Sequence, residues 1–181
     1  GYGARANQSA VERFMKRYFL VAKEVGALTR TLCARLEADN AKQTPKGLQR
    51  FLSSGRKRTA PVEAGFHVDG GRLNLEGQTV LDTPANALRL FAIAERLDID
   101  IHPDAFGQVS RRVRAFDPAW RKQPEVRAAF LEVIASKRHP GAALRLMNEA
   151  GVLGKYVPEF GRIVAQMQFN MYHHYTVDEH T

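Results

Sequence analysis

The sequence predicts a mainly α fold: a helical domain with one long N-terminal helix, one small β-hairpin and about five further helices. Three observations predict it. Apolar residues recur at helical spacing near the N-terminus, one stretch alternates in polarity around a Gly-Gly pair, and prolines precede most later apolar-periodic stretches. A chain of 181 residues, 44% of them hydrophobic, can bury one sizeable core.

The predicted long helix begins at a capping box, in which Ser9 and Glu12 can each bond the other's backbone N–H. Behind it, apolar residues recur every three or four positions, at Val11, Phe14, Met15, Tyr18, Phe19, Ala22, Val25, Leu28, Leu32 and Leu36. This spacing predicts a helix from Ser9 to about Ala38, with Cys33 as a small core residue.

Cysteine content and hydropathy indicate a cytoplasmic protein. The single Cys33 cannot form an internal disulfide, which fits a reducing compartment. No apolar run approaches the length of about 18 residues that a membrane span needs. The first residues lack the apolar core of a signal peptide. We therefore expect no membrane association.

Residues 39–62 lack periodicity and are predicted to form a mobile basic loop. The stretch 41–62 contains six basic residues and no acidic one, so it supplies +6 of the net charge of +8. Such a segment is either a solvated loop or a surface that attracts RNA, a nucleotide or an acidic partner. Phe51 is its one aromatic residue, which weakens the case for nucleic acid.

The stretch "FHVDGGRLNL", residues 66–75, is predicted to be a β-hairpin that turns at Gly70-Gly71. In that register Asp69 faces Arg72, and His67 lies on the polar face without a functional role. A lone hairpin is marginally stable, so we expect it to pack on helices. The other face is apolar and consists of Phe66, Val68, Leu73 and Leu75.

Prolines are expected to start the later helices, because proline at the first helical position loses no hydrogen bond. Five helices are predicted in this way, with a further short turn at Pro118–Trp120 and a left-handed Gly151 closing the fourth helix. The five helices are expected to begin at Pro84, Pro103, Pro124, Pro140 and Pro158.

Catalytic motifs are sparse. A nucleotidyltransferase site requires a Gly-Ser pair and an Asp-x-Asp pair that holds a metal against a triphosphate. Gly1-Tyr-Gly3 resembles the glycine turn of such sites, but no Gly-Ser pair follows it, and Asp98-Ile-Asp100 is better explained as a connector between helices. The sequence also lacks a nucleophile elbow and a phosphate-binding GxxxxGK[ST] loop.

The histidines do not form a complete metal site. His102 and His139 each precede a proline, which is typical of residues at the start of a helix. His173, His174 and His180 cluster in the sequence, but metal binding there would need further ligands. A second capping box, Thr176-Val-Asp-Glu179, predicts that another helix starts near the end of the sequence.

Four strings of the sequence together resemble one enzyme family. They are "SAVERFMKRYFLVAKEVGALTR", "FHVDGGRLNL", "ALRLMNEAGVLGKYVPEFGRIVAQMQ" and "YHHYTVDEHT". They resemble the bifunctional uridylyltransferase/uridylyl-removing enzymes of bacterial nitrogen signalling, over essentially the whole chain and least in the basic loop. In that family a nucleotidyltransferase domain precedes a helical domain, and an HD-type phosphohydrolase domain follows it.

The resemblance implies a division of the chain and a function. Residues 1–175 would be the helical domain and residues 176–181 the truncated start of the HD domain. The parent enzyme would use UTP and Mg²⁺ or Mn²⁺ to uridylylate the signalling protein PII, and would remove UMP when glutamine is high. This piece, which would link the two catalytic domains, is expected to be inactive alone and to hold no cofactor.

The resemblance transfers few site residues. His180, within "YTVDEHT", matches the first metal ligand of the HD domain. On the polar side of the first helix, Lys16, Arg17 and Lys23 are candidates to face the UTP phosphates, or else are solvated charges. The alternative function is a basic α-helical RNA-binding module of a tRNA-type nucleotidyltransferase.

Overall fold

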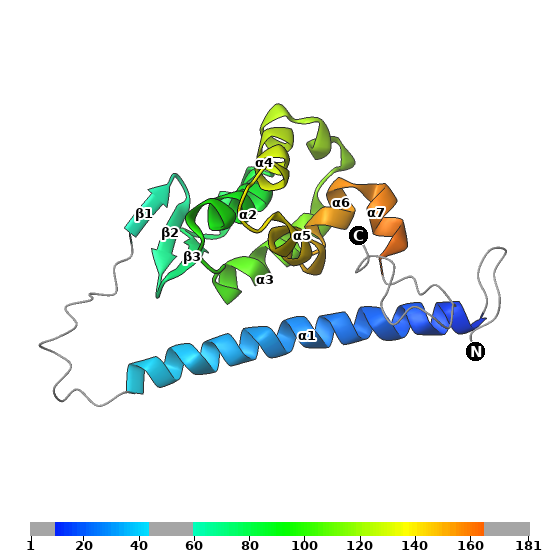
Figure 1. Ribbon diagram of the computed structural model, residues 1–181, viewed down its shortest axis with the longest axis horizontal. Coiled ribbons are helices and arrows are strands. Elements are labelled where there is room, and N and C mark those ends of the chain that lie inside the picture. The colour runs from blue at the N-terminus through cyan, green and yellow to red at the C-terminus, as the bar shows by residue number, and fades with distance from the viewer. Residues whose placement is uncertain (1–9, 44–59, 165–181) are drawn as a thin grey trace, which may run out of the picture.

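A long helix lies alongside a compact helical body that carries a small sheet at one end (Figure 1). The computed structural model describes residues 10–43 and 60–164. The long helix is α1 (Ala10–Gln43). The body contains α2 (Asn86–Leu97), α3 (Pro103–Arg112), α4 (Pro124–Ile134), α5 (Pro140–Glu149), α6 (Val152–Tyr156) and α7 (Pro158–Ile163). Short 3₁₀ helices are η1 (Gln78–Asp82), η2 (Val113–Ala115) and η3 (Pro118–Lys122). The predicted mainly α fold is confirmed.

The predicted hairpin is present in the predicted register. Strands β2 (Phe66–Asp69) and β3 (Arg72–Leu75) are antiparallel, and Phe66 pairs with Leu75 as Asp69 pairs with Arg72. Gly70 and Gly71 have φ values of 59° and 81°, which glycine adopts without steric cost. The hairpin is part of a three-stranded sheet, because β1 (Ala60–Glu63) pairs with β2.

The prediction that residues 39–62 form a loop is wrong at both ends of this range. Helix α1 continues to Gln43, and β1 begins at Ala60. The remainder, residues 44–59, lies outside the described residues, as do the predicted domain boundary at 175/176 and the second capping box. The apolar periodicity of the sequence stops before residue 39, so it does not show the last turn of α1. Only the backbone conformation of the folded chain reveals that turn. A four-residue edge strand gives too short a pattern to recognise.

The prolines mark helix starts as predicted. Pro103, Pro124, Pro140 and Pro158 each occupy the first helical position, whereas α2 begins two residues after Pro84. The predicted turn at Pro118 is η3. Helix α6 was not predicted, because its five residues, which lie between Gly151 and Pro158, are too few to show a period. Gly151 has the predicted left-handed conformation, with φ 76°.

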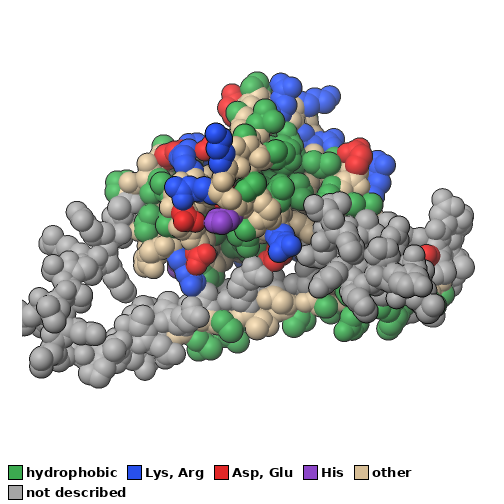
Figure 2. All heavy atoms as spheres, in the orientation of Figure 1, with side chains coloured by type: hydrophobic (Ala, Val, Ile, Leu, Met, Phe, Trp, Pro, Cys, Tyr) green, Lys and Arg blue, Asp and Glu red, His purple; other side chains and the backbone are tan. Residues whose placement is uncertain are grey.

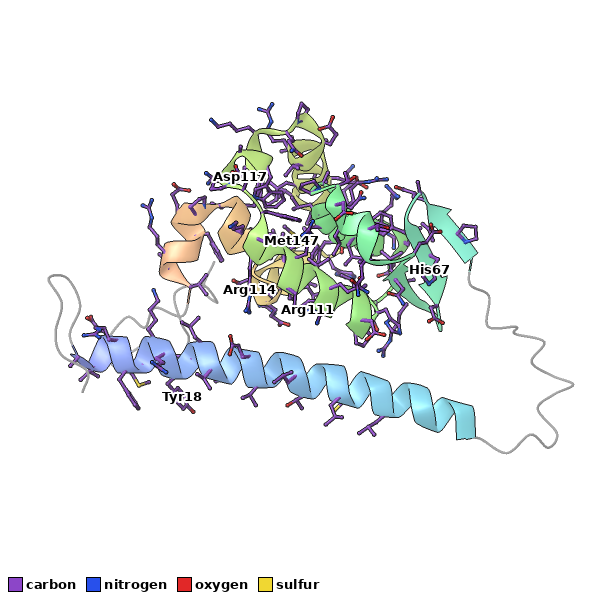
Figure 3. The ribbon with its side chains drawn as sticks, turned by 180° about the vertical axis from the view of Figure 1, so that it is seen from behind. Tyr18, His67, Arg111, Arg114, Asp117 and Met147 are labelled. Atoms are coloured by element: carbon purple, nitrogen blue, oxygen red, sulfur yellow. The ribbon has the colours of Figure 1, made fainter. Side chains whose placement is uncertain are left out.

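Helix α2 forms the centre of the core. It contacts α4, α5 and η1, and its residues Leu88, Leu90 and Phe91 are almost fully buried. The apolar face of the hairpin covers one side of the core, where Phe66 and Leu73 are completely buried. Figure 3 shows Met147, also completely buried, projecting from α5 into the body. The hairpin therefore leans on helices, as expected.

The connector after α2 joins the helices to the sheet. Asp98 caps α2 in a left-handed conformation with φ 55°. The backbone N–H of Leu73 donates to Asp100 O at 2.8 Å, and His102 N–H donates to Leu73 O at 2.8 Å. The interpretation of Asp98-Ile-Asp100 as a connector between helices agrees with this geometry. The paired backbone of the connector fixes the start of α3 relative to β3.

A small ion-pair network ties the edge strand to two helices. Glu63 on β1 pairs with Arg89 on α2 at 2.6 Å and with Arg96 further along α2. Arg96 also pairs with Glu132 on α4 at 2.7 Å. Burial tends to raise the pKa of Glu63, but hydrogen bonds and charges from Arg89 and Arg96 outweigh burial, and the net pKa is below its usual value.

The prediction that Cys33 is a core residue is wrong, because Cys33 is exposed. The apolar residues of α1 around it are exposed as well, including Val25, Leu32 and Leu36. A helical period shows that a helix has an apolar side, but it does not show whether another part of the same chain covers that side. Here the body covers a different side of α1.

The cleft between α1 and the helical body

A cleft of about 710 Å³ separates α1 from the helical body. Leu20, Glu24 and Leu28 line it from α1. The opposite wall is formed mainly by α3, η2 and the end of α5. Figure 3 shows Arg111 and Arg114 on the side of the body that faces α1. The cleft brings together residues that are far apart in the sequence.

Arg111 reaches this position because of a glycine on the preceding turn. A Cβ atom at Gly107 would lie 3.2 Å from Arg111 Nη1, so the absent side chain leaves room for the guanidinium along α3. Gln108, next to Gly107, also lines the cleft. Within the described part of the chain its buried Oε1 atom has no hydrogen-bond partner. This wall is therefore polar, with donors from arginine and an acceptor from glutamine.

The charges of the cleft are mixed. Arg114 lies 3.9 Å from Glu24 across the cleft, a long and exposed ion pair. Asp104 and Glu149 add further carboxylates to the lining. Since exposed pairs of this kind contribute little, the pair only weakly holds α1 against the body. The described lining has no His, Cys or Lys side chain, and its one hydroxyl, Ser110 Oγ, donates to the backbone oxygen of Phe106 at 2.9 Å.

Of the predicted phosphate contacts, the structure describes the side chains of Lys16 and Arg17. Lys16 Nζ lies 3.4 Å from the backbone oxygen of Arg162 on α7, so this side chain is turned toward the body. Arg17 is exposed and lies about 100° further around the helix. Lys23 belongs to α1, but its side chain lies outside the described residues, as does His180. Their predicted roles therefore stay predictions.

The arginines of the cleft were not predicted from the sequence. Most of the net charge is found in residues 41–62, outside the cleft. Arg111 and Arg114 are three residues apart, a spacing that places two side chains on one side of a helix. That spacing was a signal in the sequence. Its meaning depended on α1 lying opposite, which the sequence does not show.

Two of the three described histidines stand at helix starts. His102 caps α3, with its Nδ1 atom accepting from Asp104 N–H at 3.2 Å, and His139 precedes α5. His67 lies in β2, half-buried, on the face opposite Phe66. Among the residues that the structure describes, no group of three His, Cys, Asp or Glu side chains is arranged to hold a metal ion.

A second cavity of about 420 Å³ lies between α2 and α5. Asp98, Asp100 and His139 are among its lining residues. Asp98 pairs with Arg138 at 3.4 Å, and Glu95 accepts hydrogen bonds from Ser136 and from His139 N–H. These contacts join the end of α2 to the start of α5. The polar groups of this cavity therefore explain how two helices are held together.

No described helix is both long and apolar enough to cross a lipid bilayer. Comparisons with known proteins bear on the family. The family model described as "Uridylyltransferase GlnD third domain" matches residues 66–156, which are the sheet strands β2 and β3 and the body as far as α6. None of the solved structures compared with the chain matches it.

Curated relatives match the whole chain. The "Bifunctional uridylyltransferase/uridylyl-removing enzyme" of Caulobacter vibrioides (strain NA1000 / CB15N) is 55% identical over 183 aligned residues, which cover 100% of this chain and 20% of that protein. The protein of the same description from Phenylobacterium zucineum (strain HLK1) is 53% identical, over 100% of this chain and 19% of its own length. The chain thus spans about a fifth of these relatives, and it belongs to the GlnD uridylyltransferase family.

Proposed function

We propose that the chain is part of a bifunctional enzyme that transfers UMP from UTP to a tyrosine of PII and removes it again, according to glutamine. The observation that carries the proposal is the 55% identity over the whole chain to a relative named for both activities. In this proposal residues 1–175 form the helical domain between the two catalytic domains. Residues 176–181 begin the HD domain.

The fold suits a connecting role. Helix α1 has 34 residues, so it is about 50 Å long at 1.5 Å per residue. The body beside it is built around one continuous core. A body with one core, next to a helix of this length, can keep two opposing active sites apart. We propose that this piece supplies that separation and is inactive alone, with both sets of catalytic groups contributed by neighbouring domains.

Metal and nucleotide binding belong to the parent enzyme in this proposal. The described residues do not fit a metal site, since no suitable group of ligands is present among them. We propose that His180 is the first ligand of an HD site that binds Mg²⁺ or Mn²⁺ in the parent. Arg17, which is exposed, remains the better candidate for the UTP phosphates, because Lys16 is directed at α7.

The partners follow from the same proposal. PII is the protein substrate, and UTP and glutamine act through other domains of a cytoplasmic enzyme. We propose no nucleic-acid partner. The alternative function, an RNA-binding module, depended on the charge of residues 41–62 alone. The family match favours the uridylyltransferase over that alternative.

An activity assay tests the proposal. The longer polypeptide that contains this chain and the 181-residue chain are each incubated with labelled UTP, PII and Mg²⁺ or Mn²⁺. We expect labelled PII with the longer polypeptide, release of the label when glutamine is added, and no transfer with the chain alone. Circular dichroism confirms that the isolated chain is helical. The proposal is wrong if the folded longer polypeptide leaves PII unlabelled.

A further inference from the structure

The side of α1 next to its body-facing side has an unbroken heptad pattern. Apolar residues are separated alternately by three and four positions from residue 11 to residue 32. Their exposed fractions run from 50% to 70%. The residues of this heptad face are Val11, Phe14, Tyr18, Val21, Val25, Leu28 and Leu32, of which Leu28, at its edge, also lines the cleft. An exposed apolar surface of this extent on a folded protein marks a contact with another surface.

The described body leaves most of the heptad face uncovered. Contacts from α1 to the body come from the adjacent side of the helix, through Lys16 to α7 and Glu24 to Arg114. Of the heptad face, Leu28 alone lines the cleft, and its side is open enough for an exposed fraction of 70%. Figure 3 shows Tyr18 projecting away from the body. Figure 2 shows hydrophobic side chains along the edge of α1 that is remote from the body. Helix α1 therefore has two contact sides, of which the described residues cover one.

The width of the apolar surface indicates what kind of partner it fits. In a two-stranded coiled coil the apolar seam occupies two of seven positions, and charged residues flank it. On α1 the flanking position after Phe14, Val21 and Leu28 is also apolar or small, and it is occupied by Met15, Ala22 and Thr29. Three apolar positions in seven are typical of a helix buried in the core of a globular assembly.

We infer that the heptad face of α1 packs against another folded part of the longer polypeptide to which the chain belongs. This inference rests on the proposed function, since it places the chain within a larger enzyme. About four fifths of the length of the matched relatives lies outside this chain, so ample polypeptide exists to cover the face. The partner surface is apolar and spans about 30 Å of α1 at 1.5 Å per residue.

Thiol labelling tests this inference without measuring enzyme activity. Cys33→Ser removes the one cysteine of the chain, and Val25→Cys then places a thiol on the heptad face. Gly26→Cys is the matched control, because it lies one residue further along and about 100° around the helix. A Cβ atom at Gly26 would have nothing within 4 Å. Leu32→Cys is a second reporter of the face, should Val25→Cys fail to fold.

Labelling by N-ethylmaleimide is followed by peptide mass spectrometry in the 181-residue chain and in the longer polypeptide. We expect Val25→Cys to react fast in the chain and roughly tenfold or more slowly in the longer polypeptide, with Gly26→Cys reacting similarly in both. Fast reaction of Val25→Cys in both the chain and the longer polypeptide would overturn the inference.

Slow reaction of Val25→Cys in the isolated chain would also overturn it. A dependence on protein concentration would then identify a second copy as the occupant, and independence would identify a segment of the chain itself. None of these results bears on uridylyl transfer.

Discussion

Arg89 on α2 donates to the carboxylate of Glu63 on β1 at 2.6 Å, which joins the edge strand to the central helix. The same carboxylate accepts from Arg96, whose other nitrogen reaches Glu132 on α4. The two arginines of α2 thus connect this helix to β1 and to α4, which are separated from it in the sequence. Strand β1 is hydrogen-bonded to β2 on one side only. The ion pairs of Glu63 therefore add to the few backbone hydrogen bonds that hold this strand.

Glu63→Gln should lower the free energy of unfolding by about 1 kcal/mol at pH 7, since the groups are partly exposed and solvent weakens their attraction. Because the folded pKa of Glu63 is below its ordinary value near 4.5, its charge stabilises the fold above that pH. The contribution is lost as the pH falls through the lowered folded pKa. Urea unfolding of both proteins at pH 7 and pH 3 measures the change.

Glu132→Gln is the control for that prediction, because it removes a partner of Arg96 alone and should have a smaller effect. A difference between Glu63→Gln and the parent sequence that grows on acidification would contradict the assigned direction of the pKa.

Gly161→Ala should destabilise the body by about 1–3 kcal/mol, because overpacking forces backbone shifts. A Cβ atom at Gly161 would lie 2.6 Å from the carbonyl oxygen of Gly154, so α6 and α7 could not keep their present approach. Gly141→Ala is the control, since its Cβ atom would meet nothing within 4 Å on α5. Thermal unfolding of the two variants distinguishes them. Equal midpoints would refute the close approach.

Arg17→Ala in the longer enzyme should raise the KM for UTP roughly tenfold if its guanidinium contacts a phosphate, because a hydrogen bond to a charged group is lost. Arg145→Ala removes another exposed arginine, on α5, and serves as the control. Steady-state kinetics with varied UTP measures both variants. An unchanged KM for Arg17→Ala would leave this side chain as a solvated charge.

His180→Ala in the longer enzyme should abolish the removal of UMP from PII and largely spare the transfer of UMP. The expectation follows from the match of "YTVDEHT" to the first metal ligand of an HD domain, because removing one ligand typically disables such a site. His174→Ala, six residues earlier, is the control. Both activities are assayed on PII. Removal at the unchanged rate, or loss of both activities in a folded protein, would show that the assigned role is wrong.

Several features follow from neighbouring residues alone and were predicted correctly. The register from Phe66 to Leu75 follows from a Gly-Gly turn and from alternation, since a shift by one residue would expose the apolar face. Helix starts follow from proline, whose fixed φ and missing N–H suit the first helical position. His102 caps α3 for a comparable local reason, through its bond to Asp104 N–H.

Other features depended on residues that meet only in the folded chain. The pairing of β1 with β2, the crossing of Gly154 and Gly161, and the placement of Arg114 opposite Glu24 leave no periodic pattern in the sequence. The sequence by itself determined that α1 is a helix with an apolar side. Only the tertiary structure decided that Val25 and Leu32 on that side are exposed, because burial depends on which surface lies opposite a helix and not on its own period.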